Sequence, residues 1–233
     1  MYLIDRFISI RRPVIAGLAL AMALMVAPLA NAGSVTMQLT GAGNNIMGGV
    51  YVNPYTASIN GVPGFEVFCN DFNSPTYINE TWTAHESTFD DLSEAKWVKA
   101  GVTDALNLYN QVAWLTLQLM ASNDSTTRGQ ISFAMWGIFT PTALNRLNDT
   151  NKQAAQGWID DAKAQNLSAA MFSNFRVYTP LGQGTCSNGQ LCGVPQEFLR
   201  VQTPEAPALW TLGLHLLGVF ALLLGTRLRP TRV

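Results

Sequence analysis

The chain is poor in charged residues and in histidine. Charged side chains make up 12% of its 233 residues, the 14 basic and 15 acidic residues nearly cancel, and only two histidines are present. Without an excess of positive charge, the electrostatic basis for nucleic-acid binding is missing. A histidine-rich metal site is excluded by number, since His215 lies in a long apolar run and leaves His85 alone in the rest of the chain.

Other features of common binding sites are also missing. No glycine-rich phosphate loop with a lysine is present. Six oxygen-bearing side chains could supply ligands to calcium, but their spacing matches no EF-hand loop. These residues are Asp71, Asn73, Glu80, Glu86, Asp90 and Asp91. We expect solvated loops at these positions and predict no metal or other cofactor.

The first 32 residues are typical of a secretory signal peptide. Basic residues, an apolar stretch and small residues follow one another as Arg6, Arg11 and Arg12, then Val14 to Leu29, then Ala30, Asn31 and Ala32. This order of a charged start, an apolar segment and a small-residue cleavage site directs a chain to export. We predict cleavage after Ala32, with Ala30 and Ala32 forming the cleavage site.

Residues 33–202 have the length of one domain. Strand-like patterns occupy Val35 to Thr40, Val50 to Ile59, Gly64 to Phe68, Tyr77 to Ala84, Phe175 to Thr179 and Gln196 to Val201. Helical periodicity runs from a cap at Asp104 to about Met120, from about Thr127 to Phe139, and from Asn151 to Gln165. Strands, then helices, then strands predict an α+β domain, a small antiparallel sheet or sandwich with a helical insertion.

Three cysteines fall in this predicted exported domain. Cys186 and Cys192 flank an Asn188-Gly189 turn. Two strands that return through such a turn bring their sulfurs within reach of a disulfide, which persists in an oxidising compartment. We therefore predict a Cys186–Cys192 disulfide. Cys69 is left unpaired, either as a reactive thiol or as a small buried side chain.

The last 31 residues have three parts in a fixed order. Pro204, Glu205, Ala206 and Pro207 come first, an uncharged apolar run to Thr226 follows, and a basic end over 227–233 closes the chain. An apolar run of about 20 residues is long enough for a helix to cross a bilayer. We predict a C-terminal transmembrane helix at about 207–226 as part of the fold, with its basic end on the cytoplasmic side.

This order of parts resembles the PEP-CTERM sorting tail, although Ala206 stands where the family has its second proline. The resemblance implies processing by exosortase, a membrane transpeptidase, in a Gram-negative bacterium that makes exopolysaccharide. It also implies transient anchoring in the inner membrane, followed by the cell surface or the extracellular matrix. An ordinary C-terminal anchor with a proline-rich stalk is the alternative.

Two segments of the body resemble surface thioester domains, which join a cysteine sulfur to a glutamine carbonyl. Phe68-Cys69-Asn70-Asp71-Phe72 is similar to their strand that ends in cysteine, and Ala134-Met135-Trp136 is similar to the end of their Gln-x-Ala-Ile-Trp helix. The departure is Ser132, which occupies the glutamine position and has no acyl carbon. Gln130 lies two positions earlier, about 200° away on a helix.

We expect a non-enzymatic exported protein of the cell surface or the exopolysaccharide matrix. One alternative is an adhesin that crosslinks to amines through a Cys69–Gln130 thioester, which requires the helix to begin after Gln130. A second alternative is a hydrolase that uses Cys69 and His85 as nucleophile and base. Exopolysaccharide is a candidate partner, and Trp82, Trp97 and Trp158 are candidate platforms for sugar rings.

Overall fold

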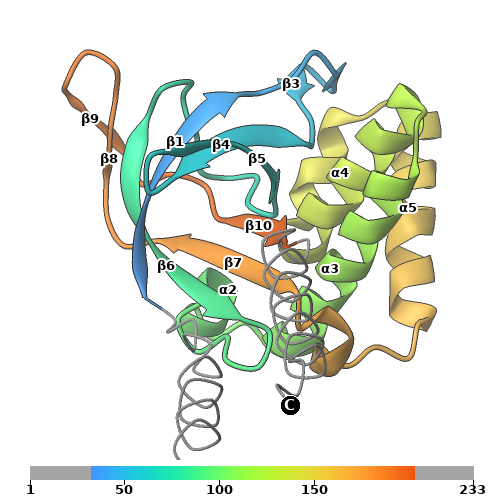
Figure 1. The fold of residues 1–233 in the computed structure, drawn as a ribbon. Helices are drawn as coiled ribbons and strands as arrows, with labels where there is room; N and C mark the ends of the chain where they lie inside the picture. The colour runs from blue at the N-terminus through green and yellow to red at the C-terminus, as the bar shows by residue number, and fades with distance from the viewer. Residues whose placement is uncertain (1–32, 203–233) are drawn as a thin grey trace, which may run out of the picture. The chain divides into compact units, whose positions relative to one another are not determined.

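The computed structural model describes residues 33–202 (Figure 1). The predicted signal peptide, with its cleavage site at Ala30 and Ala32, lies outside these residues. So does the predicted sorting tail with Pro204, Glu205, Ala206 and Pro207, together with the transmembrane helix predicted at about 207–226.

The described chain begins with strands, continues with helices and ends with strands. The first strands are β1 (Ser34–Gly41), β2 (Ile46–Met47), β3 (Val50–Tyr51), β4 (Tyr55–Ile59), β5 (Val62–Cys69) and β6 (Thr81–Thr88). The last strands are β7 (Phe175–Pro180), β8 (Gly184–Thr185), β9 (Leu191–Gly193) and β10 (Phe198–Val201). The helical segments between them are therefore an insertion, as the sequence predicts.

Six of these strands close into an antiparallel barrel, in the order β1-β4-β5-β10-β7-β6. The closure depends on β1, which pairs with β4 along one edge and with β6 along the other; Met37 lies opposite Ile59 on one side and Trp82 on the other. The predicted small antiparallel sheet or sandwich is therefore wrong, because the six strands form a closed barrel. Its edges are removed because the two sides of one eight-residue strand are both hydrogen-bonded.

The helical segments between β6 and β7 pack beside the barrel (Figure 1). They are α2 (Lys96–Lys99), α3 (Ala105–Ala121), α4 (Ser125–Phe139), η1 (Pro141–Arg146), α5 (Asp149–Ala164) and η2 (Ala169–Phe172). The three long helices, α3, α4 and α5, lie side by side in Figure 1. They correspond to the three helices predicted from the sequence, whereas the short α2 was not predicted.

The core runs through the barrel into the helices and is rich in aromatic rings. Inside the barrel, Phe198 stacks on Trp82 with ring centroids 5.9 Å apart and meets Tyr55 edge-on at 6.0 Å. Between barrel and helices, Trp136 packs against Phe72 at 5.4 Å and against Phe133 at 4.9 Å. Such pairs bury large apolar areas in fixed geometries and so orient α4 against the loop that follows β5.

Across residues 33–202, no helix has both the length and the apolar character needed to cross a membrane. The membrane helix that was predicted as part of the fold class thus has no counterpart in the described structure. The fold class is corrected to a closed antiparallel barrel with a helical insertion.

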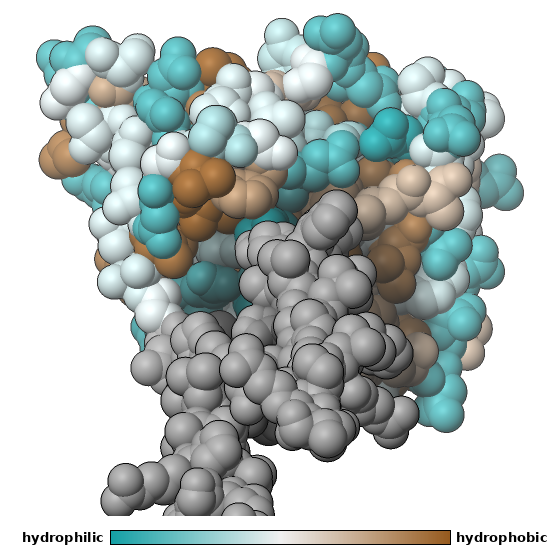
Figure 2. Space-filling view, in the orientation of Figure 1, coloured by the Kyte–Doolittle hydropathy of each residue, from teal (hydrophilic) through white to brown (hydrophobic). Residues whose placement is uncertain are grey.

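The surface of the described residues mixes polar and apolar patches. Figure 2 shows apolar side chains reaching the viewed face in separate patches among polar ones. The exposed large apolar side chains include Ile46, Val62, Leu106, Met171 and Leu191. They come from both the barrel and the helices.

Candidate functional site

Cys69 ends β5 at the junction of barrel and helices, and its backbone is held from both sides. The side chain of Asn53 accepts a hydrogen bond from the Cys69 N–H at 2.7 Å and donates one to its carbonyl oxygen at 3.1 Å. The Trp136 indole of α4 donates to the same carbonyl at 3.0 Å. All three residues are buried. The segments that resemble thioester domains therefore do meet in space, through a backbone carbonyl.

The thiol of Cys69 is fully buried and contacts the backbone of Asp71, two residues later. Its Sγ donates to the Asp71 carbonyl oxygen at 3.2 Å and lies 3.3 Å from the Asp71 amide nitrogen. Burial raises the pKa of the thiol far above its usual range, and the nearby Asp71 charge raises the pKa further. Because only the thiolate is a strong nucleophile, this environment favours an inert thiol.

Gln130 and Ser132 lie on α4 but make contacts away from Cys69. Gln130 Nε2 donates to Asn151 of α5 at 3.0 Å, and the buried Ser132 hydroxyl donates to the Arg128 carbonyl at 2.8 Å. The helix begins at Ser125, before Gln130, contrary to what the thioester alternative requires. In the described part of the chain no hydrogen bond links Gln130 to Cys69, so the thioester stays a prediction without support from this geometry.

His85 lies on β6, opposite Ser34 of β1 and Thr179 of β7. The charges that it influences are those of Asp91 and Glu94, in the segment after β6. No hydrogen bond joins His85 to Cys69 among residues 33–202. The hydrolase alternative is therefore left with a buried, protonated thiol and a histidine that faces other groups.

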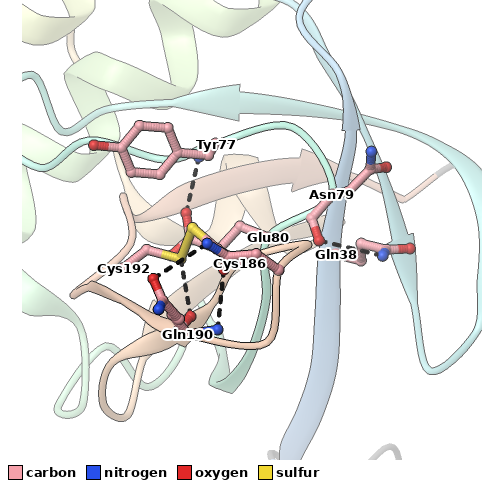
Figure 3. The surroundings of a disulfide bond; sticks show 8 residues. Gln38, Tyr77, Asn79, Glu80, Cys186, Gln190 and Cys192 are labelled. Carbon is pink, nitrogen blue, oxygen red and sulfur yellow. Dashed lines mark hydrogen bonds between the residues drawn. A yellow bond between two sulfur atoms is a disulfide. The ribbon is translucent and has the colours of Figure 1, made fainter.

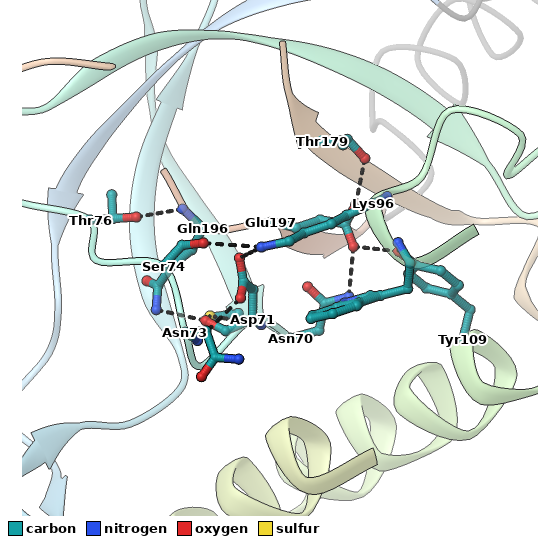
Figure 4. Close-up of polar contacts among 12 residues, drawn as sticks. Asn70, Asp71, Asn73, Ser74, Thr76, Lys96, Tyr109, Thr179, Gln196 and Glu197 are labelled. Atoms are coloured by element: carbon teal, nitrogen blue, oxygen red, sulfur yellow. Dashed lines mark hydrogen bonds and ion pairs between the residues drawn. The ribbon is translucent and has the colours of Figure 1, made fainter. Parts of the chain in front are cut away.

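A buried carboxylate, Glu197, accepts four hydrogen bonds from four different segments (Figure 4). The donors are Asn70 Nδ2 at 2.9 Å, the Tyr109 hydroxyl at 2.5 Å, the Thr179 hydroxyl at 2.5 Å and the Lys96 backbone N–H at 2.7 Å. Burial raises the pKa of Glu197, while the donors oppose this rise. The group joins the loop after β5, α2, α3 and β7, and the sequence analysis missed it.

Asp71 is a second buried carboxylate in the same loop. It forms an ion pair with Lys96 Nζ, which also donates to the Ser74 hydroxyl at 3.0 Å, and its Oδ1 accepts from the Asn73 N–H at 3.2 Å. Gln196 Nε2 donates to the Asp71 carbonyl at 2.9 Å. The expectation of a solvated acidic loop is therefore wrong here, because Asp71 is oriented inward as a partner for Lys96.

Glu80 is also buried and not solvated. Its Oε2 accepts from the Tyr77 backbone N–H at 2.8 Å, and burial raises its pKa. Gly184 of β8 passes so close that an added Cβ would lie 2.0 Å from Glu80 Oε1. These contacts fix the end of the loop over 70–80. No cluster of three or more metal-binding side chains is found among the described residues.

This loop forms one wall of an open groove of about 530 Å³. Phe72 and Trp136 line it, and Tyr51 and Tyr77 border it with half of their surface exposed. The Arg146 guanidinium lies 5.9 Å from the centre of the Phe72 ring. Apart from Arg146, the polar lining residues are neutral: Asn73, Ser74, Thr76 and Gln196. A groove with aromatic faces and a few polar groups has the character of a ligand-binding site.

The tryptophans predicted as sugar platforms are packed against other rings. Trp82 is buried in the barrel, Trp97 stacks on Phe139 at 5.0 Å, and Trp158 packs against Trp114 at 6.4 Å. The exposed aromatic rings of the groove are tyrosines instead. The sequence pattern predicts strands over Val50 to Ile59 and Tyr77 to Ala84. The structure instead has Tyr51 in the two-residue β3 and Tyr77 in the loop before β6, so the strand pattern gave no sign that the two rings are exposed.

The Cys186–Cys192 disulfide is confirmed, with a Cα–Cα distance of 5.7 Å (Figure 3). It links the ends of the β8–β9 hairpin, in which the Cys186 N–H donates to the Gln190 carbonyl at 2.8 Å. Gly189 has a φ of 79°, the left-handed conformation that the predicted Asn-Gly turn provides. Cys69 is the free cysteine of the described residues.

We predict that Glu197→Ala destabilises the protein by about 3 to 5 kcal/mol, because it leaves several buried donors without an acceptor. The measurement is urea unfolding followed by tryptophan fluorescence. Glu66→Ala, which removes an exposed glutamate from β5, is the matched control and should change stability by less than about 0.5 kcal/mol. Equal losses of unfolding free energy in the two variants would show that the Glu197 network does not stabilise the fold more than an exposed glutamate does.

We predict that Cys69 resists iodoacetamide in the folded protein and reacts once the protein is unfolded in urea. Mild reduction should meanwhile expose Cys186 and Cys192, which lie in a surface hairpin, to rapid labelling and so provide an internal control. Intact-mass measurement should show the full mass of the chain with one disulfide. A mass lower by one ammonia, with no thiol labelled after unfolding, would establish the thioester.

No family model, no curated protein and no solved structure matches this chain. The resemblances to the sorting tail and to thioester domains therefore rest on the residues quoted above. What the groove and the buried network do has to be inferred from their chemistry.

Proposed function

We propose that this chain is an exported, non-enzymatic protein of the cell surface or the exopolysaccharide matrix, processed through its C-terminal sorting tail. The structural observation that carries the proposal is the Cys186–Cys192 disulfide. Disulfides form and persist in oxidising compartments, outside the cytoplasm. This agrees with a signal peptide over residues 1–32 and with the tail that begins at Pro204.

The interior supports a non-catalytic role. Cys69 is buried as a neutral thiol, and Glu197 and Asp71 are occupied by donors from neighbouring segments. Buried carboxylates with such partners hold neighbouring segments together. The exposed groove lined by Tyr51 and Tyr77 is better suited to binding than to bond breaking.

The proposed partner in processing is an exosortase-type transpeptidase at the inner membrane. The Pro204-Glu205 element would be its recognition site, and the apolar run and basic end behind it would hold the chain at the membrane until cleavage. The mature protein then reaches the surface or the matrix. Ala206, in place of the family's second proline, makes Pro204 and Glu205 the residues on which recognition depends.

We predict that Pro204→Ala blocks processing, whereas Pro230→Ala in the basic end does not. Both substitutions remove one proline from the tail, and only the first alters the motif. Immunoblotting of cell fractions should show an unprocessed chain retained with the membranes for Pro204→Ala and a normally shortened product for Pro230→Ala.

Deleting residues 204–233 should release a soluble product that is exported and no longer retained. Identical localisation of the deletion variant and the full chain would refute sorting by the tail. Recovery of the full chain from the cytosol with Met1 still attached would refute export itself.

A further inference from the structure

We propose that the groove bordered by Tyr51 and Tyr77 binds an acidic glycan, one that carries uronic-acid sugars. The proposal deepens the proposed function, because it names the matrix component that the exported domain would contact. It depends on three features of the groove, which are the exposed aromatic faces, the neutral polar groups and a single cation.

The aromatic faces suit the apolar side of a sugar ring. Tyr51 and Tyr77 keep 50% and 51% of their surface exposed, so part of each ring is available to a ligand. The face of an aromatic ring is the negative part of its quadrupole and attracts the slightly positive C–H groups of a pyranose. Two such rings along one groove provide platforms for neighbouring sugars of a chain.

The polar lining suits hydroxyl groups. Asn73 contributes a side-chain amide. The Gln196 amide nitrogen already donates to the Asp71 carbonyl, and the Ser74 and Thr76 hydroxyls each accept one internal hydrogen bond, so the Gln196 amide offers its oxygen as an acceptor and the two hydroxyls act as donors. The Asn73 side chain is exposed and makes no hydrogen bond within the described part of the chain, so both of its polar atoms remain for a ligand. Amides donate and accept, which matches sugar hydroxyls because they do the same.

The charge of the lining gives the preference for an acid. Arg146 is the one charged residue that lines the groove, and the lining contains no carboxylate. Within residues 33–202 its guanidinium has no acidic partner, and it lies over the Phe72 ring. A guanidinium binds a carboxylate through two parallel hydrogen bonds, so a uronate on a sugar held by the tyrosines would supply the missing charge.

An apolar peptide is a less suitable occupant. Its recognition calls for a pocket that buries side chains away from water, whereas the tyrosines here stand at the border of an open groove with polar groups between them. An acidic peptide would satisfy Arg146 and gain less from the two ring faces. Polyaspartate is therefore included below as the probe for that outcome.

The test is binding of the purified protein to polygalacturonate, measured by isothermal titration calorimetry. Fully methyl-esterified polygalacturonate has the same sugar without the charge, and dextran is a neutral glucan. We expect binding to polygalacturonate, binding at least about tenfold weaker to the methyl ester, and no comparable binding to dextran or polyaspartate. Equal binding to polyaspartate, or no binding to polygalacturonate, would overturn the proposal.

Two groove variants and one control locate the site. Tyr77→Ala should weaken binding to both pectins about tenfold, whereas Arg146→Gln should weaken binding to polygalacturonate and leave the methyl ester unchanged. Arg200→Gln is the matched control, because Arg200 lies 3.9 Å from the centre of the Phe65 ring and does not line the groove. If Tyr77→Ala and Arg146→Gln both bind polygalacturonate as tightly as the wild type and the control do, the groove is not the site.

Tyr51→Ala provides a second test of the aromatic border, should Tyr77→Ala unfold more easily than the wild type. The outcome also separates this inference from the proposed function. An exported and processed protein that fails to bind polygalacturonate refutes only the glycan site, whereas a protein that binds through Arg146 but remains in the cytosol refutes the proposed export and sorting and leaves the binding site standing.

Discussion

The joint between the barrel and the helices depends on the buried carboxylate of Glu197. Its four donors come from the loop after β5, from α2, from α3 and from β7. A carboxylate without partners is costly inside a protein, and so are donors without an acceptor. Any arrangement that separates α3 from the barrel would break the Tyr109–Glu197 hydrogen bond and leave the buried carboxylate short of one donor. The network therefore favours one packing of the helices, and the aromatic contacts of Trp136 with Phe72 and Phe133 add to the same joint.

Features set by neighbouring residues were predictable from the sequence. The alternation of Val35, Met37 and Leu39 marks the inward face of β1, and the Asn188-Gly189 turn gives the disulfide hairpin. The three long helices follow from apolar periodicity. Even here the residue that caps the start of a helix was not predicted correctly. Asp104 precedes α3 without capping its backbone, whereas Asp124, which was not predicted as a cap, accepts from Thr127 at the start of α4.

Features set by distant partners were not predictable. The barrel closes because β1 pairs with β6 as well as with β4, and its alternating pattern is the same whether one edge or both are paired. Asp71 and Glu80 appear in the sequence as ordinary polar loop residues. They are buried because Lys96, 25 positions after Asp71, and the Tyr77 backbone provide their partners. The candidate groove was missed for the same reason, since its residues come from β3, the loop over 72–78, α4 and η1.

The same buried contacts leave the surface groove as the candidate site of this domain. Glu197 fixes Asn70, the Lys96 pair fixes Asp71, and Cys69 is held through its backbone by Asn53 and Trp136. Every residue of this segment that would attract attention as a nucleophile or a base is thereby used to hold one loop in place. A loop held at so many points presents Tyr77 and Asn73 in a fixed geometry, which lowers the entropy lost when a ligand binds. The cysteine-ending strand thus serves as a rigid support, and the groove beside it is where such rigidity benefits recognition.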